Sequence, residues 1–201
     1  MLSNLSTSLV SVIYNFQLMH AAAENGIAAY GVVMYASFIA TSIYLGYAIG
    51  INPIVGYHYG ADNKSELHNL LTKSLRITGV TALSITLLSE LLALPIARLF
   101  VGYDLVLCEM TRTGFMLYAI SYLFSGFNIF SSSLFTALSD GKTSAIISFG
   151  RTCVFIILSL MILPNILGLT GVWLAIPVAE FLAVFVSVYY QWTKRKKYGY
   201  L

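Results

Sequence analysis

The sequence is poor in charge and has no Lys or Arg before Lys64. Only 9% of its 201 residues are Asp, Glu, Lys or Arg, whereas a soluble chain carries about 25%. This scarcity excludes a water-facing surface of ordinary composition, because too few charged groups are present to solvate it. The missing basic start also argues against a cleaved signal peptide, which needs a positive N-terminal region.

Cysteines and catalytic motifs are also scarce. The two cysteines, Cys108 and Cys153, provide no disulfide framework. The chain contains no His-Glu-x-x-His, Gly-x-Ser-x-Gly, Walker or Cys-x-x-Cys pattern. Its basic residues form no single patch on a polar domain. We therefore expect no enzyme activity, no metal site, no cofactor and no nucleic-acid partner.

Long hydrophobic runs fill most of the chain. Hydrophobic residues make up 58% of it, and the mean hydropathy is +0.82. A transmembrane helix needs about 20 mostly apolar residues, and the runs do not show the strict alternation typical of barrel strands. The sequence therefore predicts an all-α integral membrane protein, a bundle of six transmembrane helices over residues 5–23, 27–51, 70–94, 114–138, 144–163 and 171–192.

The connections between these runs predict the orientation of the chain. Residues 60–69 are expected to form a polar cytoplasmic loop, and residues 95–113 an amphipathic segment on the outer interface. The outer side then receives only Arg98 and Arg112. The other side receives eight basic residues, namely Lys64, Lys73, Arg76, Lys142, Lys194, Arg195, Lys196 and Lys197. By the positive-inside rule, both termini are expected on the cytoplasmic side of the plasma (inner) membrane.

Two charged residues within the predicted spans are candidates for function. Glu180 follows Pro177 by three residues, and a proline frees the backbone carbonyl four residues before it. A carboxylate beside such a break is either an ion or proton site or a structural group bonded to a neighbouring helix. Arg151 lies two turns into the fifth predicted helix, where it either reaches the inner headgroups or pairs with a buried acid.

Uncharged polar residues mark two further positions. Asn15 and Gln17 lie in the first predicted helix, and Asn128 lies in the fourth. Groups of this kind inside a membrane either bridge helices or line a water-filled cavity. The sequence leaves both interpretations open.

The end of the second predicted helix carries a recognisable motif. Residues 52–61 read Asn-Pro-Ile-Val-Gly-Tyr-His-Tyr-Gly-Ala. This segment resembles the Pro-x-x-Gly-Tyr-x-Tyr-Gly-Ala signature of the multidrug and toxic compound extrusion (MATE) transporters, although the family often has Gln where this chain has Asn52. The matching residues are Pro53, Gly56, Tyr57, Tyr59, Gly60 and Ala61. Residues 24–31, 126–128 with 135–138, and 171–180 resemble the same family in the same order.

The resemblance is to the C-terminal six helices of a transporter that has about twelve helices in two lobes. It implies a secondary active exporter of organic, often cationic compounds, driven by inward flow of protons or sodium ions. Some members place acids in the first and fourth helices of this lobe, where this chain has Asn15 or Gln17 and Asn128. Glu180 is then the strongest remaining candidate for the ion pathway.

The resemblance also implies partners and leaves alternatives. Besides the lipid bilayer and small organic substrates, the partner is either the N-terminal lobe of the same transporter, if the chain is a fragment, or a second copy, if it is a half-transporter. A related lipid-linked saccharide flippase is a second interpretation, but a pyrophosphate needs several cationic residues and the spans offer only Arg151. A transport-inactive fragment or membrane scaffold is a third.

Overall fold

The computed structural model describes residues 2–200, and the side chains of residues 8–200. Its described part consists of helices and short turns, without a strand. The elements are α1 (Leu2–Gly60), α2 (Lys64–Val101), α3 (Leu105–Ala119), α4 (Tyr122–Ala137), α5 (Gly141–Phe149), the π turn η1 (Gly150–Val154), α6 (Phe155–Leu167) and α7 (Leu169–Tyr198).

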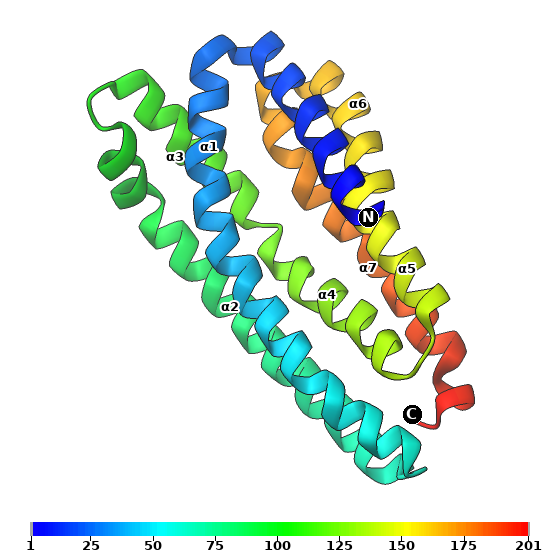
Figure 1. The fold of residues 1–201 in the computed structure, drawn as a ribbon. Coiled ribbons are helices and arrows are strands. Elements are labelled where there is room, and N and C mark those ends of the chain that lie inside the picture. The colour runs from blue at the N-terminus through cyan, green and yellow to red at the C-terminus, as the bar shows by residue number, and fades with distance from the viewer. Residues whose placement is uncertain (1, 201) are drawn as a thin grey trace.

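These elements make six passes along one bundle. Helix α1 reverses at Ala23, where φ is 50° and ψ is −144°, so that it forms two antiparallel arms (Figure 1). Helices α3 and α4 form one pass bent by 44°, and α5, η1 and α6 run on as another. Helices α1, α2, α5–α6 and α7 are each long and apolar enough to cross a membrane, and the bent pair adds a fifth candidate. With α1 counted as two arms, the predicted six-helix all-α bundle is confirmed.

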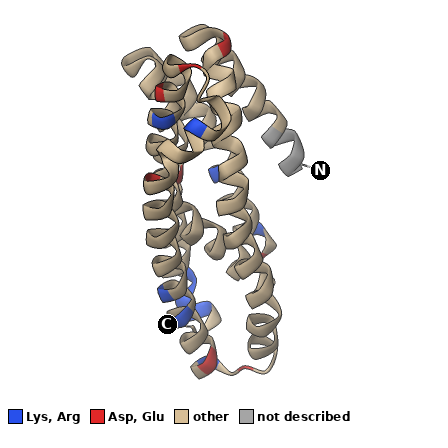
Figure 2. Cartoon of the chain, turned by 90° about the vertical axis from the view of Figure 1, so that its left-hand side faces the viewer, with Lys and Arg blue, Asp and Glu red and all other residues tan. Residues whose placement is uncertain are grey.

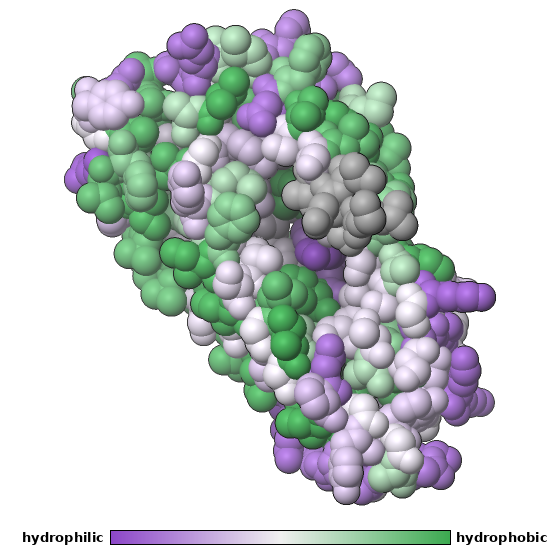
Figure 3. All heavy atoms as spheres, in the orientation of Figure 1, coloured by the Kyte–Doolittle hydropathy of each residue, from purple (hydrophilic) through white to green (hydrophobic). Residues whose placement is uncertain are grey.

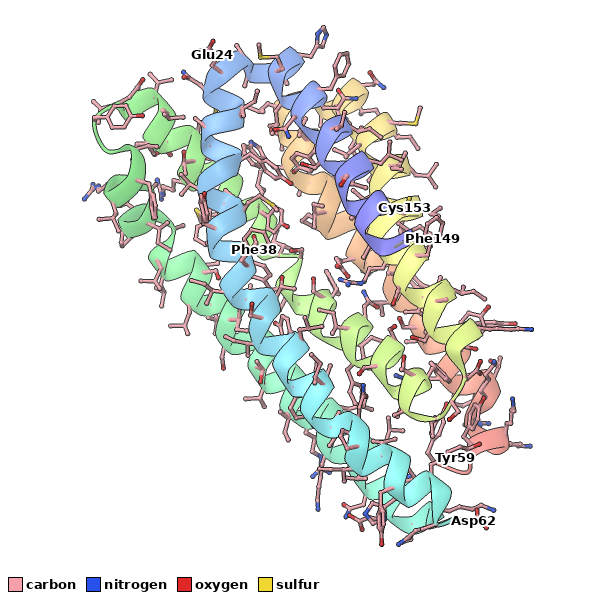
Figure 4. All side chains as sticks on the ribbon, viewed as in Figure 1. Glu24, Phe38, Tyr59, Asp62, Phe149 and Cys153 are labelled. Carbon is pink, nitrogen blue, oxygen red and sulfur yellow. The ribbon has the colours of Figure 1, made fainter. Side chains whose placement is uncertain are left out.

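Charge separates the two ends of the bundle. The turn between α1 and α2, the turn between α4 and α5, and the C-terminus lie at one end (Figure 1). Lysine and arginine gather there (Figure 2), and we call it the Lys-rich end. The reversal of α1 and the turn between α2 and α3 lie at the opposite end, where Figure 4 shows Glu24. Much of the surface between the ends is hydrophobic (Figure 3).

The predicted loop over residues 60–69 is much shorter in the structure. Helix α1 continues to Gly60, and α2 begins at Lys64. Asn63 caps α2, because its side-chain oxygen accepts a hydrogen bond from the backbone N–H of Glu66 at 3.1 Å. The prediction of a ten-residue loop was wrong, because polar residues 64–69 form the first turns of a helix that extends beyond the apolar run.

Residues 95–113, predicted to form one amphipathic segment on the outer interface, are divided between two helices. Helix α2 passes through Pro95 and ends at Val101, and α3 starts after Asp104. The Asp104 carboxylate accepts hydrogen bonds from the backbone N–H groups of residues 106 and 107 at 2.8 and 3.1 Å. This cap starts a helix nine residues before the expected span. That span, predicted over residues 114–138, is instead divided at residues 120–121.

The remaining passes are longer than predicted. The pass expected over residues 144–163 occupies residues 141–167, and the one expected over residues 171–192 occupies residues 169–198. Prolines 53, 95, 164 and 177 all lie inside helices. Neighbouring helices in a membrane bundle can satisfy the carbonyls that a proline frees, so proline is a weaker boundary here than in a soluble protein.

Two close helix contacts depend on glycine. A Cβ atom at Gly126 would lie 2.6 Å from the ring of Tyr44, and one at Gly114 would lie 2.6 Å from the ring of Trp173. Both distances are too short for a side chain. These glycines let aromatic residues of α1 and α7 pack directly against the α3–α4 pass, which places α4 in the middle of the bundle.

Candidate functional site

Glu180 lies deep inside the bundle. It is 11 residues after the start of α7 at Leu169 and 18 before its end at Tyr198, which corresponds to about 16 and 27 Å along the helix. It is buried, as is Pro177 one turn earlier, where α7 continues without ending. An ionised carboxylate at this depth needs hydrogen-bond donors from neighbouring helices.

Arg151 provides the first donor. Its Nη1 donates to Oε1 of Glu180 at 2.7 Å, and the exposed side-chain fractions are 19% for Arg151 and 6% for Glu180. Arg151 lies in η1, the π turn that joins α5 to α6. Such turns are rare and occur frequently at functional sites. Of the two roles that the sequence left open for Arg151, the structure therefore shows pairing with a buried acid.

Asn128 provides the second donor. Its Nδ2 lies 2.8 Å from Oε2 of Glu180 and 2.9 Å from the Glu180 backbone oxygen. The Ser187 hydroxyl in turn donates to Oδ1 of Asn128 at 2.9 Å, which holds the amide with its N–H groups toward the carboxylate. Sequence reasoning missed Ser187. The available signal was its position seven residues after Glu180, which places both on one face of α7.

A cavity of about 420 Å³ lies beside the ion pair. Arg151 and Glu180 are the only formally charged residues among its described lining, and Ser121, Ser125 and Thr152 add hydroxyls. Four aromatic residues also line it, namely Tyr30, Phe38, Tyr118 and Tyr122. Figure 4 shows Phe38 about halfway along the second arm of α1. In the same view, Figure 3 shows a hollow at mid-height with a hydrophilic patch inside it.

The other two candidate residues lie apart from the ion pair. Gln17 donates from Nε2 to the backbone oxygen of Leu160 at 3.0 Å, so it bridges α1 and α6. Asn15 donates to the oxygen of Ser11 in its own helix at 2.9 Å. It lines a second hollow of about 300 Å³, which shares Tyr30 and three other lining residues with the first.

The MATE-like motif lies at the Lys-rich end, far from Glu180. From Pro53 to Gly60 it forms the last two turns of α1, and it ends in the turn to α2 at Ala61, whose N–H donates to the oxygen of Tyr57 at 3.0 Å. Tyr59 packs edge-on against Tyr198 of α7, with ring centroids 5.7 Å apart. A Cβ atom at Gly56 would lie 3.6 Å from the oxygen of Ala137, so the motif also contacts the end of α4. The motif therefore packs against α4 and α7 at the Lys-rich end.

A second ion pair closes the same end. The Asp140 carboxylate accepts from Lys194 at 2.5 Å, from the hydroxyl of Tyr198 at 2.8 Å and from the hydroxyl of Thr143 at 2.8 Å. Burial raises the pKa of Asp140, but donation by Lys194, Tyr198 and Thr143 outweighs it and holds that pKa well below its usual range. We call these four residues the Asp140 clasp.

Comparison with known proteins identifies the family. The MatE family model matches residues 1–162. The inward-facing form of a multidrug resistance MATE family transporter covers 98% of the chain, with a TM-score of 0.91 and 23% sequence identity. The outward-facing form covers 98%, with a TM-score of 0.88 and 23% identity. A transporter from Pyrococcus furiosus, described as having a binding pocket of reversed polarity, covers 98% with a TM-score of 0.89 and 22% identity.

The chain spans less than half of each solved structure, 46%, 44% and 44% respectively. No curated protein matches it. The family model covers most of the chain, and the fold is that of one six-helix lobe in structures of both inward-facing and outward-facing transporters. The chain therefore belongs to the MATE family of multi-pass membrane transporters.

Proposed function

We propose that this chain is one lobe of a secondary active exporter that moves small organic compounds across the membrane in exchange for protons or sodium ions. The observation that carries the proposal is the Arg151–Glu180 pair beside an aromatic cavity in the middle of the bundle. An ionisable group at this depth is costly, and in membrane proteins it usually marks a substrate or ion pathway.

We propose that Glu180 couples the export of the organic compound to the opposite movement of protons or sodium ions. Both of its carboxylate oxygens accept hydrogen bonds, one from Arg151 on η1 and one from Asn128 on α4. A proton or sodium ion that binds the carboxylate competes with these donors for the same lone pairs. Its binding therefore weakens the contact of α7 with η1 and α4, and its release restores that contact.

Transport by this mechanism needs a second lobe. Alternating access in such transporters moves one bundle against another around a central site, and this chain forms one bundle. We propose that the second lobe is either the N-terminal half of the same transporter or a second copy of this chain. The excess of Lys and Arg at the Lys-rich end supports a cytoplasmic location for that end and both termini.

The alternative of a lipid-linked saccharide flippase has less support. A pyrophosphate group needs several unpaired cations, and the described lining of the cavity contains one, already paired with Glu180 at 2.7 Å. A transport-inactive scaffold would use the ion pair only to hold its helices together and would not need the cavity beside it. It is the outcome to expect if the following experiment fails.

The test is dye transport in proteoliposomes, with the chain alone and with the chain fused to the N-terminal six helices of a MATE transporter. We expect an ion gradient to drive movement of the zwitterionic dye rhodamine 110 or of its methyl ester, the cationic rhodamine 123. Glu180→Gln should lower that rate at least tenfold, because it removes the charge that binds the coupling ion.

The matched control is Glu90→Gln, which changes a carboxylate of α2 that does not line the cavity. This variant should transport normally. If neither dye moves in any arrangement, the exporter proposal is wrong. If Glu180→Gln transports as well as the unmodified chain, Glu180 does not couple the flows.

A further inference from the structure

One face of the second half of α7 is apolar and exposed. Five large exposed side chains form it, namely Phe181, Phe185, Val188, Tyr189 and Trp192. At about 100° per residue, these positions fall on one side of a helix. Helix α7 is long and apolar enough to cross a membrane, so this face contacts lipid acyl chains. We call it the α7 stripe.

Four consecutive cations follow the stripe and divide between two sides of the helix. Lys194 binds the clasp carboxylate, and the Lys197 ammonium lies 4.9 Å from the centre of the buried Tyr198 ring. Arg195 and Lys196 are turned from Lys194 by about 100° and 200°, which brings both to the side of the stripe. Two cations therefore stabilise the bundle end, and the other two border the lipid-facing side.

Arg195 is held against the last residue of the stripe. Its guanidinium carbon lies 3.5 Å from the centre of the Trp192 ring, which is a cation–π contact. Trp192 is 62% exposed, and tryptophan is enriched where the hydrocarbon of a membrane meets the headgroups. The contact therefore fixes a guanidinium at the level of the headgroups. Arginine binds phosphate through two parallel hydrogen bonds, so the position suits the phosphate of a phospholipid.

The dimensions of two helices agree with this level. From its first residue, Leu169, to Trp192, α7 rises about 35 Å. On α2, Arg76 and Arg98 enclose a largely apolar segment about 33 Å long. Both lengths slightly exceed the hydrocarbon core of a bilayer, about 30 Å, as expected for tilted helices. Trp192 and Arg76 therefore mark the membrane boundary at the Lys-rich end.

The end of α7 is also strongly basic. The chain has no Asp or Glu after Glu180, and four of its last eight residues are Lys or Arg. Figure 2 shows Lys and Arg gathered beside the C-terminus. A basic segment beside a bilayer raises the binding constant of anionic lipids by roughly fivefold per Lys or Arg. The sign of the charge therefore selects an anionic headgroup.

We propose that the end of α7 binds an anionic phospholipid. The lipid phosphate binds the guanidinium of Arg195 and the ammonium of Lys196, and its acyl chains lie along Trp192, Tyr189 and Phe185. An anionic headgroup neutralises the two cations, whereas a zwitterionic headgroup brings a cation that they repel. The inference goes beyond the proposed function, and its test involves no transport measurement.

Quenching of tryptophan fluorescence by brominated lipids measures binding at this position. The chain has two tryptophans, of which Trp173 is only 2% exposed, and the emission of Trp192→Phe gives its contribution. The full chain is placed in bilayers that contain brominated phosphatidylglycerol, an anion, or brominated phosphatidylcholine, which has the same phosphate but no net charge. We expect the anionic lipid to bind beside Trp192 at least tenfold more tightly.

Variants of the two cations locate the site. Arg195→Gln should lower the preference for the anionic lipid at least fivefold. Lys196→Gln should lower it less, and Arg195→Lys should keep part of it, because lysine retains the charge but loses the two-point contact. The matched control is Arg76→Gln, which removes an exposed arginine from α2 at the same end. It should change the preference by less than twofold.

A comparison of salts distinguishes a lipid headgroup from free phosphate. At equal ionic strength, inorganic phosphate should lower the preference no more than chloride does, because a free ion lacks the acyl chains that contact the stripe. A larger loss with inorganic phosphate would show that the cations bind the ion from solution, and it would overturn the proposal.

Two further outcomes would overturn it. The proposal fails if both lipids quench Trp192 equally in the unmodified chain. It also fails if Arg195→Gln and Arg76→Gln lower the preference equally, since the general charge of the Lys-rich end would then attract the lipid. If Arg195→Gln is not folded by circular dichroism, Arg195→Lys and the unmodified chain decide by the same criteria.

Discussion

Among the described residues, two partly buried ion pairs involve α7, and they differ in their surroundings. Arg151 and Glu180 meet halfway along the bundle beside a cavity of about 420 Å³, and the Arg151 side chain makes one hydrogen bond with the described residues. Lys194 and Asp140 meet at the Lys-rich end, where the Asp140 carboxylate accepts from three side chains and one backbone N–H. Neither residue of this second pair lines the cavity.

We propose that this difference separates a functional pair from a structural one. Asp140 has its hydrogen-bonding capacity filled by the protein, and its partners tie the start of α5 to the end of α7. Among the described contacts, Glu180 and Arg151 make fewer hydrogen bonds than they can, and both line a cavity. The same chemistry, a carboxylate and a cation within 3 Å, therefore stabilises the fold at one position, and in our proposal it serves transport at the other.

Among changes to the Asp140 clasp, Asp140→Ala should lower the stability of the fold most. The change removes the N-cap of α5 and the partner of Lys194 and Tyr198, so we expect a loss of about 2–3 kcal/mol in stability. Thermal melting in detergent measures it. Dye transport by the folded fraction should stay within twofold of normal. A large loss of transport without a change in melting would show that the clasp takes part in transport.

The same carboxylate should make stability depend on pH. The folded-state pKa of Asp140 lies below its unfolded value of about 3.9. Its contribution is therefore complete above that value and is lost as the pH falls toward the folded-state pKa. The melting difference between the unmodified chain and Asp140→Asn should be constant from pH 8 to about 5 and shrink below about 4. A difference that changes most near neutral pH would contradict this account of the clasp.

The smallest effect should come from Tyr198→Phe. The variant loses one hydrogen bond to Asp140 but keeps the ring contacts with Phe135, Tyr59 and Tyr200. We expect it to lower stability by about 1 kcal/mol without changing dye transport. Tyr189→Phe, on the exposed surface of α7, is the matched control and should leave the melting temperature unchanged.

Sequence reasoning predicted the passes of this fold better than their ends. The hydrophobic runs indicate six spans because lipid requires apolar helices. Their ends were misplaced where polar residues continue a helix beyond the apolar run, as at residues 64–69, and where Asn63 and Asp104 provide caps. The division at residues 120–121 and the π turn were missed, since Ile120 does not mark a break by residue type and an isolated glycine such as Gly150 inside an apolar run does not specify a π turn.

The sequence singled out residues of the candidate site but did not predict which of them contact one another. Glu180, Arg151 and Asn128 were each singled out because polar groups are costly inside a membrane. Their meeting depends on α4, η1 and α7 packing together, and Asn128 lies 52 residues from Glu180 along the chain. A single sequence contains no information on such a contact. Asn15 and Gln17 were singled out for the same reason, but Gln17 bridges two helices and Asn15 lines the adjoining hollow.

The most direct test compares two double variants, each of which replaces both charged residues of one ion pair by neutral residues. One variant carries Arg151→Met with Glu180→Gln, and the other carries Asp140→Asn with Lys194→Met. Replacing both partners of a buried pair by neutral groups is often neutral or stabilising. The account therefore predicts that the first variant melts at or above the normal temperature but does not transport dye. The second should melt lower, because Asp140→Asn also removes the carboxylate oxygen that accepts hydrogen bonds from Thr143 and Tyr198, and it should still transport. Normal transport by the first variant, or loss of transport only in the second, would contradict the central claim that the Arg151–Glu180 pair is the functional site.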